Sequence, residues 1–331
     1  MKKLLVLLLI LFGISTVANA DIIASFVTGT TGYQQLYDST TLASGAWKSL
    51  APSDMNGVHD VGQLPNGDVV IAYRTGSSDY LQIFDGTTLA DGVSTVLDGV
   101  KSVSGLADGN VAATYTNLDG NDVVQIFDGT TLAAGVSLEW DAGDTLKDVT
   151  GLTDGNIVLA YNAGGSKDYV EIYDTNLTTS GSAWMDQVGI ERVTGMANGD
   201  VAVYYGAGTN YLQIFSGDGA WTGGAWIAHQ QIKDIGGTSV GDIAVAYTSG
   251  STDYLQIFNG ETLASDGAWV AISTIRDIDG DYLPELLPPA CGDENHPYPA
   301  GDANKDCEVN FDDFVYIARS WQECTHPDGC D

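Results

Sequence analysis

Short stretches that alternate apolar and polar residues recur along the chain with nearly the same sequence. The clearest is 80–84, where Leu81 and Ile83 flank Gln82. Its equivalents are centred on Leu36, Ile126, Ile172, Ile214 and Ile257. Together with Ile83, these centres lie 42 to 47 residues apart along the chain. An alternation with a period of two predicts β-strands, and a repeat of this length built from strands is typical of a propeller.

Each repeat contains three further predicted strands. In the repeat of Ile83 these strands are 58–64, 68–73 and 93–97. The second of them is apolar on both faces, as expected of a strand that lies between two sheets. Asn66-Gly67 comes just before it, and this dipeptide favours a tight hairpin with the preceding strand. Four strands per repeat correspond to one blade of a β-propeller.

The number of strands predicts how the ring closes. The second, third and fourth strands of the repeat occur six times, but a first strand precedes only the last five copies. The sixth first strand, residues 275–283, follows the last copy. We therefore predict an all-β fold, a six-bladed β-propeller over residues 21–286, whose last strand pairs with its first strand to complete one blade. Such a closure leaves no free sheet edge.

The first 20 residues have the three parts of a secretory signal peptide. Lys2-Lys3 form the charged start, residues 4–12 the apolar core, and Ala18-Asn19-Ala20 the cleavage site. The apolar core is too short to span a bilayer. We predict that residues 1–20 are removed and that the exported chain has no membrane span.

The charge balance restricts the partners. The chain has 44 acidic and 12 basic residues, and its formal net charge is −32. Such a surface repels nucleic acid and anionic membranes, so we expect neither as a partner. We expect a monomer.

Charged residues gather at the start of the first strand of each blade, near one mouth of the central channel of a propeller. The candidate ligand-binding residues there are His59, Asp60, Lys101, Lys147, Asp148, Arg192, Lys233, Asp234, Arg276 and Asp277. Of the ten basic residues outside the signal peptide (12 − 2), five lie in this column. One interpretation is a polar site for sugars or anions. We favour ion pairs that set the register of the blades, because the charges follow the repeat.

Aromatic residues follow the repeat as well. A tyrosine such as Tyr73 ends five of the six second strands, and the predicted outer strands carry Trp47, Trp184, Trp226 and Trp269. Aromatic faces stack on sugars, but we expect the tyrosines to pack between blades. For the tryptophans we expect partial burial against the next blade.

The sequence gives little indication of catalysis. It has four histidines and no Gly-x-Ser-x-Gly, His-Glu-x-x-His or phosphate-loop motif. Acidic residues are abundant, so a glycoside hydrolase that uses two carboxylates is an alternative. We favour a non-catalytic protein.

The end of the predicted ring contains the sequence Asp-Ile-Asp-Gly-Asp-Tyr-Leu-Pro-Glu-Leu at 277–286. It resembles the calcium loop of integrin-like FG-GAP repeats. Alternating carboxylates followed by a glutamate suit Ca²⁺. The resemblance implies as ligands Asp277, Asp279, Asp281 and Glu285. The alternative is an acidic turn in which Asp277 belongs to the charged column.

The chain beyond the ring has two predicted parts. Residues 287–300 form a proline-rich linker, and residues 301–331 form a small module with one loop and one helix. Within 302–313, oxygen-bearing side chains occupy loop positions 1, 3, 5, 9 and 12, a spacing that wraps one hard cation. The oxygen ligands at this spacing are Asp302, Asn304, Asp306, Asn310 and Asp313, with the backbone carbonyl of Glu308.

All four cysteines, Cys291, Cys307, Cys324 and Cys330, lie in the last 41 residues. In an exported chain such a cluster predicts two disulfides. A zinc site is the alternative, although no Cys-x-x-Cys pair is present. Of the three pairings that four cysteines allow, we favour Cys307–Cys324 with Cys291–Cys330.

The C-terminal module resembles one repeat of a type I dockerin, the calcium-binding docking module of secreted polysaccharide-degrading systems. The motifs that carry the resemblance are Gly301-Asp302, Asp306-Cys307, Phe311, Asp313-Phe314, Trp321, Cys324-Thr325 and Pro327. It is most similar to the shortened, cysteine-containing form at the ends of secreted planctomycete-type proteins. Two features depart from a full dockerin: Cys307 occupies the position of a loop glycine, and only one repeat is present. The disulfides would then replace the missing second repeat.

The resemblance implies Ca²⁺ as a cofactor and a cohesin-like or cell-surface protein as a partner. It also implies an extracellular or cell-surface location in a bacterium. We therefore predict a secreted, non-catalytic binding or scaffold protein for extracellular polysaccharide utilisation, with a carbohydrate as the expected ligand of the propeller. The alternatives are a propeller glycoside hydrolase or polysaccharide lyase directed by its dockerin-like tail, and a purely structural surface protein.

Overall fold

A computed structural model describes residues 22–28, 31–50, 57–140, 143–179, 185–206, 210–218, 220–229 and 231–280. The predicted signal peptide, linker and C-terminal module, with the cysteines and the calcium ligands of that module, lie outside these residues. The described residues form 24 β-strands and no helix. Accordingly, no helix in this part of the chain is long and apolar enough to cross a membrane.

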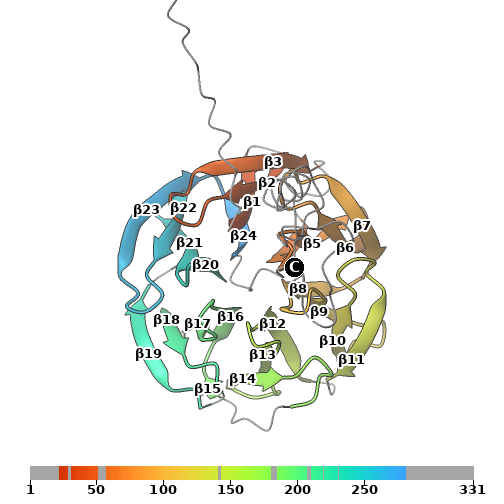
Figure 1. Ribbon diagram of the computed structural model, residues 1–331. Coiled ribbons are helices and arrows are strands. Elements are labelled where there is room, and N and C mark those ends of the chain that lie inside the picture. The colour runs from red at the N-terminus through yellow and green to blue at the C-terminus, as the bar shows by residue number, and fades with distance from the viewer. Residues whose placement is uncertain are drawn as a thin grey trace, which may run out of the picture. The chain divides into compact units, whose positions relative to one another are not determined.

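The strands form six antiparallel sheets of four strands, arranged as blades around a ring (Figure 1). From the innermost strand outwards, blade 1 consists of β24 (Ile275–Gly280), β1 (Ile22–Thr28), β2 (Thr31–Tyr37) and β3 (Ser44–Leu50). In the same direction, blade 2 consists of β4 (Val58–Gln63), β5 (Val69–Thr75), β6 (Ser78–Phe84) and β7 (Asp91–Val96). Blade 3 consists of β8 (Val100–Gly105), β9 (Val111–Thr116), β10 (Asp122–Phe127) and β11 (Ala134–Glu139).

The remaining three blades have the same arrangement. Blade 4 consists of β12 (Thr145–Gly151), β13 (Ile157–Asn162), β14 (Asp168–Tyr173) and β15 (Met185–Gln187). Blade 5 consists of β16 (Ile190–Gly195), β17 (Val201–Gly206), β18 (Asn210–Phe215) and β19 (Gly223–Ala228). Blade 6 consists of β20 (Ile232–Gly237), β21 (Ile243–Ser249), β22 (Thr252–Phe258) and β23 (Ser265–Ile272).

Blade 1 joins the two ends of the propeller. The last strand, β24, pairs antiparallel with the first strand, β1, so that Ile22 lies opposite Gly280 and Ala24 lies opposite Ile278. The predicted number of blades and the predicted closure by the terminal strands are confirmed. The closing strand ends at Gly280 in the described part of the chain.

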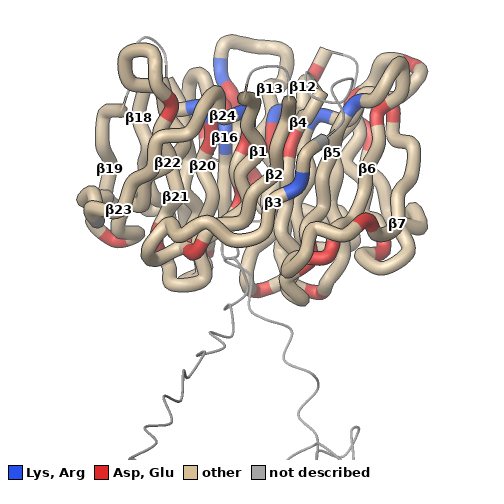
Figure 2. The backbone as a smooth tube through the Cα atoms, turned by 90° about the horizontal axis from the view of Figure 1, so that it is seen from above, with Lys and Arg blue, Asp and Glu red and all other residues tan. Residues whose placement is uncertain are grey.

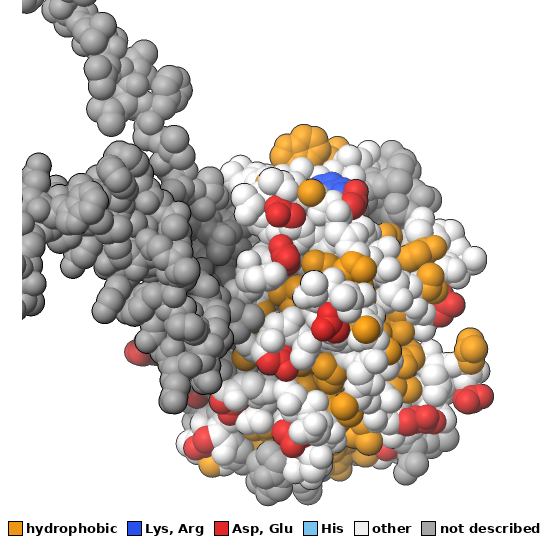
Figure 3. Space-filling view, turned by 45° about the vertical axis from the view of Figure 1, so that its right-hand side comes forward, with side chains coloured by type: hydrophobic (Ala, Val, Ile, Leu, Met, Phe, Trp, Pro, Cys, Tyr) orange, Lys and Arg blue, Asp and Glu red, His pale blue; other side chains and the backbone are white. Residues whose placement is uncertain are grey.

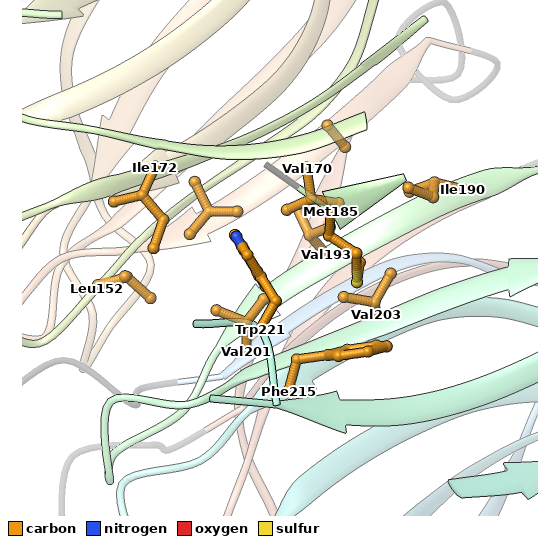
Figure 4. Close-up of a cluster of buried hydrophobic side chains, with 12 residues drawn as sticks. Leu152, Val170, Ile172, Met185, Ile190, Val193, Val201, Val203, Phe215 and Trp221 are labelled. Atoms are coloured by element: carbon orange, nitrogen blue, oxygen red, sulfur yellow. The ribbon is translucent and has the colours of Figure 1, made fainter. Parts of the chain in front are cut away.

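The apolar core lies between neighbouring blades rather than at one centre. Six clusters of buried side chains each combine residues of two adjacent blades. Between blades 4 and 5, for example, Ile172 of β14 packs with Phe215 of β18 and with Trp221 (Figure 4). The second strand of each blade is apolar on both faces, and successive side chains point to opposite faces. Each such strand therefore contributes to two interblade cores.

The turn between the third and fourth strands places a leucine between blades. In blade 2, Asp85 Oδ1 accepts hydrogen bonds from the backbone N and the Oγ1 of Thr88, both at 2.7 Å. Leu89 follows with a φ of 54°, which is uncommon for a residue other than glycine. Its side chain is buried in the cluster that includes Ile23 and Leu36 of blade 1. The burial offsets the cost of the backbone conformation.

Candidate functional site

Each innermost strand has a β-bulge at the charged column. In β4 the register against β5 shifts between Val58 and Asp60, so His59 is the extra residue. The equivalent extra residues are Lys101, Lys147, Glu191, Lys233 and Arg276. A bulge sets two consecutive residues against one partner and re-aims their side chains. The column thus consists of these bulge residues and a channel ring, which we define as the residue after each: Asp60, Ser102, Asp148, Arg192, Asp234 and Asp277.

Side chains of the channel ring connect each blade to the next. Asp60 Oδ2 accepts a hydrogen bond from the backbone N of Val103 at 2.6 Å. The same contact joins Ser102 to Val149 (3.2 Å), Asp148 to Val193 (2.7 Å), Asp234 to Ile278 (2.7 Å) and Asp277 to Val61 (2.7 Å). The guanidinium of Arg192 cannot accept a hydrogen bond, so Arg192 does not make this contact. Its Nε donates to Asp234 Oδ1 at 2.9 Å instead.

Four of the six bulge residues contact acidic residues near the start of the third strand of their own blade. The pairs are Lys101–Asp122 (2.5 Å), Lys147–Asp168 (2.8 Å) and Lys233–Asp253 (2.5 Å), and His59 lies 3.2 Å from Asp79. The acidic partners also accept backbone hydrogen bonds from the next blade, as Asp168 does from Ile190. Although burial acts to raise it, the pKa of Asp168 is lowered because Lys147 and Asn162 donate to its carboxylate. Arg276 is exposed and pairs with no acidic side chain among the described residues.

Each of these pairs lies within one blade, so they are not the expected ion pairs between blades; among the described residues of the column, Arg192–Asp234 is the ion pair that crosses a blade boundary. The paired carboxylates reach the next blade through its backbone N–H groups instead. Figure 2 shows most of the basic residues towards one rim of the ring, together with acidic residues, whereas the opposite rim shows acidic residues alone. A ligand site at this channel mouth stays a prediction.

The channel ring concentrates buried carboxylates. Asp60, Asp148, Asp234 and Asp277 are all buried, and Arg192 is the one basic residue among the six ring positions. Burial raises the pKa of Asp148 to about 7, although the guanidinium of Arg192 opposes this shift. Burial also raises the pKa of Asp60, and burial with the neighbouring carboxylates raises that of Asp277 well above its usual value.

A second polar layer fills the channel two residues further along the innermost strands. Its side chains accept backbone hydrogen bonds from the next blade: Ser104 from Gly151 (3.2 Å), Thr150 from Gly195 (3.0 Å), Thr194 from Gly237 (3.0 Å) and Asp279 from Gln63 (2.9 Å). A cavity of about 20 Å³ lies between this layer and the channel ring. That volume holds one water molecule or one ion. The channel is too narrow at this level to admit a sugar.

Two of the four ligands implied by the FG-GAP resemblance lie in the channel wall. Asp277 and Asp279 belong to β24, opposite Ser25 and Ile23 of β1. They therefore lie on a paired strand rather than in a loop, and each carboxylate already accepts a backbone hydrogen bond. Asp281 and Glu285 lie outside the described residues.

A cluster of three aromatic rings repeats on three consecutive blades, with one ring each from the second, third and fourth strands. In blade 6, Tyr247 and Tyr254 stack with ring centroids 5.6 Å apart, and Trp269 lies 5.6 Å from Tyr254. The equivalent sets are Tyr205, Tyr211 and Trp226 in blade 5, and Phe26, Tyr33 and Trp47 in blade 1. We call these three sets the aromatic triads.

The tryptophans of the triads are exposed. Trp47, Trp226 and Trp269 are 61 %, 60 % and 60 % exposed, so the expectation of partial burial against the next blade is wrong for these three. Among the described strands, none lies beyond the fourth strand of a blade. Its tryptophan packs against the neighbouring aromatic ring of the same blade and not against the next blade. Trp184 lies outside the described residues. The sequence does contain a signal for this exposure: serine replaces tryptophan at the same position in blades 2 and 3, as Ser94 and Ser137.

A glutamine amide accompanies each triad. Gln256 lies opposite Trp269 in the strand register, and the hydroxyl of Tyr247 donates to its Oε1 at 2.8 Å. The corresponding residues are Gln213 in blade 5, bound by Tyr205 at 2.6 Å, and Gln35 in blade 1, bound by Tyr37 at 3.1 Å. In blade 1 the triad and Gln35 line a groove of about 310 Å³ together with Thr28. Each triad thus combines an aromatic surface with an amide held in place.

Comparison with known proteins supports the fold alone. No protein-family model and no curated protein matches the chain. Among solved structures, a protein of unknown function from Bacteroides caccae has a TM-score of 0.55 at 10 % identity, covering 79 % of this chain and 98 % of its own. TolB from Acinetobacter baumannii has a TM-score of 0.61 at 14 % identity, covering 79 % and 67 %. A nidogen/laminin complex has a TM-score of 0.54 at 8 % identity, covering 78 % and 97 %. This chain is similar to them in its propeller architecture.

Proposed function

We propose that this chain is a secreted, non-catalytic binding protein whose propeller binds neutral polysaccharide through the aromatic triads. The observation that carries the proposal is the repetition of an exposed tryptophan, a close aromatic pair and a fixed amide on blades 5, 6 and 1; the pair is stacked in blades 6 and 1 and tilted in blade 5. The apolar faces of sugar rings stack on aromatic faces, and a few placed polar groups beside them orient the ligand.

The spacing of the triads suits a polymer better than a single sugar. Each triad is a shallow surface and offers a weak contact by itself. Three copies on consecutive blades allow the protein to hold one polysaccharide chain, or several chains of an insoluble polysaccharide, at several points at once. Linking weak contacts in this way raises the overall affinity above that of each contact. We therefore expect the ring to bind polysaccharides whose single sugar units it does not bind.

The charge of the surface favours neutral polymers. Acidic side chains are scattered among hydrophobic and uncharged ones on the face in Figure 3. The chain also carries a net charge of −32. An anionic polysaccharide would be repelled at low ionic strength.

The channel gives no support to the alternative of a propeller glycosidase. Hydrolysis of a glycosidic bond needs two carboxylates that reach the sugar from both sides. Three of the four buried carboxylates of the channel ring line a cavity of about 20 Å³, and all four accept interblade hydrogen bonds.

The C-terminal module completes the proposal as an attachment device. Its resemblance to a dockerin suggests that it binds Ca²⁺ and then a cohesin-like or cell-surface protein. In that arrangement the ring holds the polysaccharide and the tail holds the partner. Extracellular polysaccharide utilisation by a bacterium is the setting that fits both.

The test is affinity electrophoresis of the mature chain in gels that contain cellulose derivatives, xylan or mannan. We expect retardation by at least one polymer, and a variant with Trp47→Ala, Trp226→Ala and Trp269→Ala to lose it. Each single change should weaken binding about fivefold, as expected for the loss of about 1 kcal/mol of stacking.

The matched control removes three exposed apolar side chains away from the triads: Leu118→Ala, Val136→Ala and Val240→Ala. It should bind as the unaltered chain does. Equal retardation of the triple tryptophan variant would overturn the proposal. Release of reducing ends that one carboxylate change abolishes would establish the glycosidase alternative instead.

A further inference from the structure

Three carboxylates of the channel ring lie unusually close together. Asp234, Asp277 and Asp60 belong to blades 6, 1 and 2, and each has an oxygen within 4.8 Å of the other two. All three are at least nine-tenths buried, and Asp277 is 1 % exposed. Charges of one sign at this distance repel strongly where water is excluded. A proton or a cation among them removes most of that repulsion.

One oxygen of the cluster lacks a partner. Asp277 Oδ2 accepts the hydrogen bond from the backbone N of Val61, whereas its Oδ1 is buried without any hydrogen bond to the described part of the chain. Its blade lies between the blades of Asp60 and Asp234. A buried polar atom left without a partner costs about 1–3 kcal/mol, and more when it is charged. The unpaired Oδ1 therefore points to a ligand among the three carboxylates.

The other two carboxylates retain ligand capacity. The oxygens of Asp234 accept from Arg192 Nε at 2.9 Å and from the backbone N of Ile278 at 2.7 Å. A carboxylate has about four lone-pair directions, so two remain. Asp60 and Asp234 also line the cavity of about 20 Å³, whose lining includes Thr150 and Thr194.

The donors are all hard oxygens, which suit calcium. Calcium–oxygen distances are about 2.3–2.6 Å, so two ligands on opposite sides of the ion are up to about 5.2 Å apart. The separation of at most 4.8 Å in this cluster lies within that limit. Thiolate and imidazole ligands, which softer transition metals prefer, are absent from the described residues of the cluster.

We propose that a calcium ion binds in the central channel between Asp60, Asp234 and Asp277. The three ligands come from the closing blade and from its neighbour on each side. The ion would therefore hold blade 1 in the ring and protect the pairing of β24 with β1. This site is separate from the predicted loop of the C-terminal module and does not depend on the polysaccharide proposal.

The test compares variants of the full mature chain by calcium content and by thermal unfolding, after removal of calcium with a chelator and after its return. All carry Asp302→Ala and Asp306→Ala, which silence the predicted loop of the tail. We expect this background to retain one calcium ion per chain and to unfold about 5–10 °C higher with calcium, the shift for saturation near one hundred times the Kd. Asp277→Asn should lose both the ion and the calcium-dependent shift.

A matched control and a rival outcome make the result decisive. Asp122→Asn removes a buried interblade carboxylate outside the cluster, so it should lower the unfolding temperature yet keep the calcium-dependent shift. If Asp277 instead carries a proton shared with its neighbours, the background binds no calcium. Asparagine then replaces the protonated acid without loss of stability. That result, or a calcium-dependent shift that persists in Asp277→Asn, overturns the proposal.

Discussion

The Nε of Arg192 donates to Oδ1 of Asp234 at 2.9 Å across the boundary between blades 5 and 6. At five of the six ring positions the side chain accepts a backbone hydrogen bond from the next blade. Arg192 is the exception, and its guanidinium is the only basic group of the ring. Its charge offsets the repulsion among the buried carboxylates.

Replacement of Arg192 by methionine should destabilise the ring strongly. The change leaves Asp234, 4 % exposed as a side chain, without its cationic partner. Loss of one member of a buried ion pair costs about 3–5 kcal/mol. We expect the midpoint of thermal unfolding to fall by about 6–12 °C, measured by circular dichroism.

The surface pair Lys48–Asp91 serves as the control, because the Asp91 side chain is 68 % exposed. Lys48→Met should cost less than about 1 kcal/mol. Asp234→Asn in the Arg192→Met background should recover part of the loss. A midpoint for Arg192→Met within about 2 °C of the unaltered chain would contradict the assigned role.

Asp148 should make the ring less stable as the pH rises from about 4 to 7. Burial raises the pKa of its folded-state carboxyl to about 7, whereas an unfolded aspartate titrates near 3.9. Between these values the folded state keeps a proton that the unfolded state releases. The free energy of unfolding therefore falls with rising pH, by at most about 1.4 kcal/mol per unit for this group, and levels off above 7.

Asp148→Asn should remove that part of the pH dependence. The asparagine oxygen still accepts the hydrogen bond from Val193, so the variant should gain stability relative to the unaltered chain as the pH rises. Urea unfolding from pH 4 to 8 in the presence of a chelator measures the difference. Parallel pH profiles for the two proteins would show that Asp148 is ionised throughout.

Gly86→Ala should disrupt the contact between two hairpins of blade 2. A Cβ at Gly86 would lie 1.5 Å from the backbone oxygen of Gly67, and backbone cannot move aside as a side chain can. The same close approach joins Gly129 to Gly109 in blade 3. We expect a loss of about 1–3 kcal/mol or more in the free energy of unfolding.

Gly165 provides the matched control, since a Cβ there meets nothing within 4 Å. Gly165→Ala should leave the free energy of unfolding within about 0.5 kcal/mol of its original value. If both substitutions have the same small effect, the hairpins of blade 2 are more mobile than their contact implies.

The repeat explains why so much of the fold could be predicted. The hairpins between first and second strands carry turn signals, such as Asn66-Gly67. The second strands begin with apolar residues on both faces, as in the first four residues of Val69–Thr75. Because every blade obeys the same local rules, the position of one strand predicts its five equivalents. The ring begins with three strands of an incomplete blade and ends with one strand. These can complete a blade only by pairing with each other, β24 with β1.

The candidate sites were harder to predict for a physical reason. A charged column such as His59-Asp60 is visible in the sequence, but its two residues have different roles. The bulge sends one to an ion pair within its blade and the other to a backbone N–H of the next blade. Neither the bulge nor the neighbour across the blade boundary has a local sequence signal.

The sequence by itself determined the number of blades, the order of their strands and the closure of the ring, because these follow from local periodicity and turn chemistry. Only the tertiary structure decided that Asp60, Asp234 and Asp277, more than two hundred residues apart at their extremes, share one buried site. It also decided that Trp47, Trp226 and Trp269 face solvent. The first depends on how side chains of three neighbouring blades meet in the channel, and the second on how the outermost strand packs on its own blade; both are set by side-chain packing across strands and not by local periodicity.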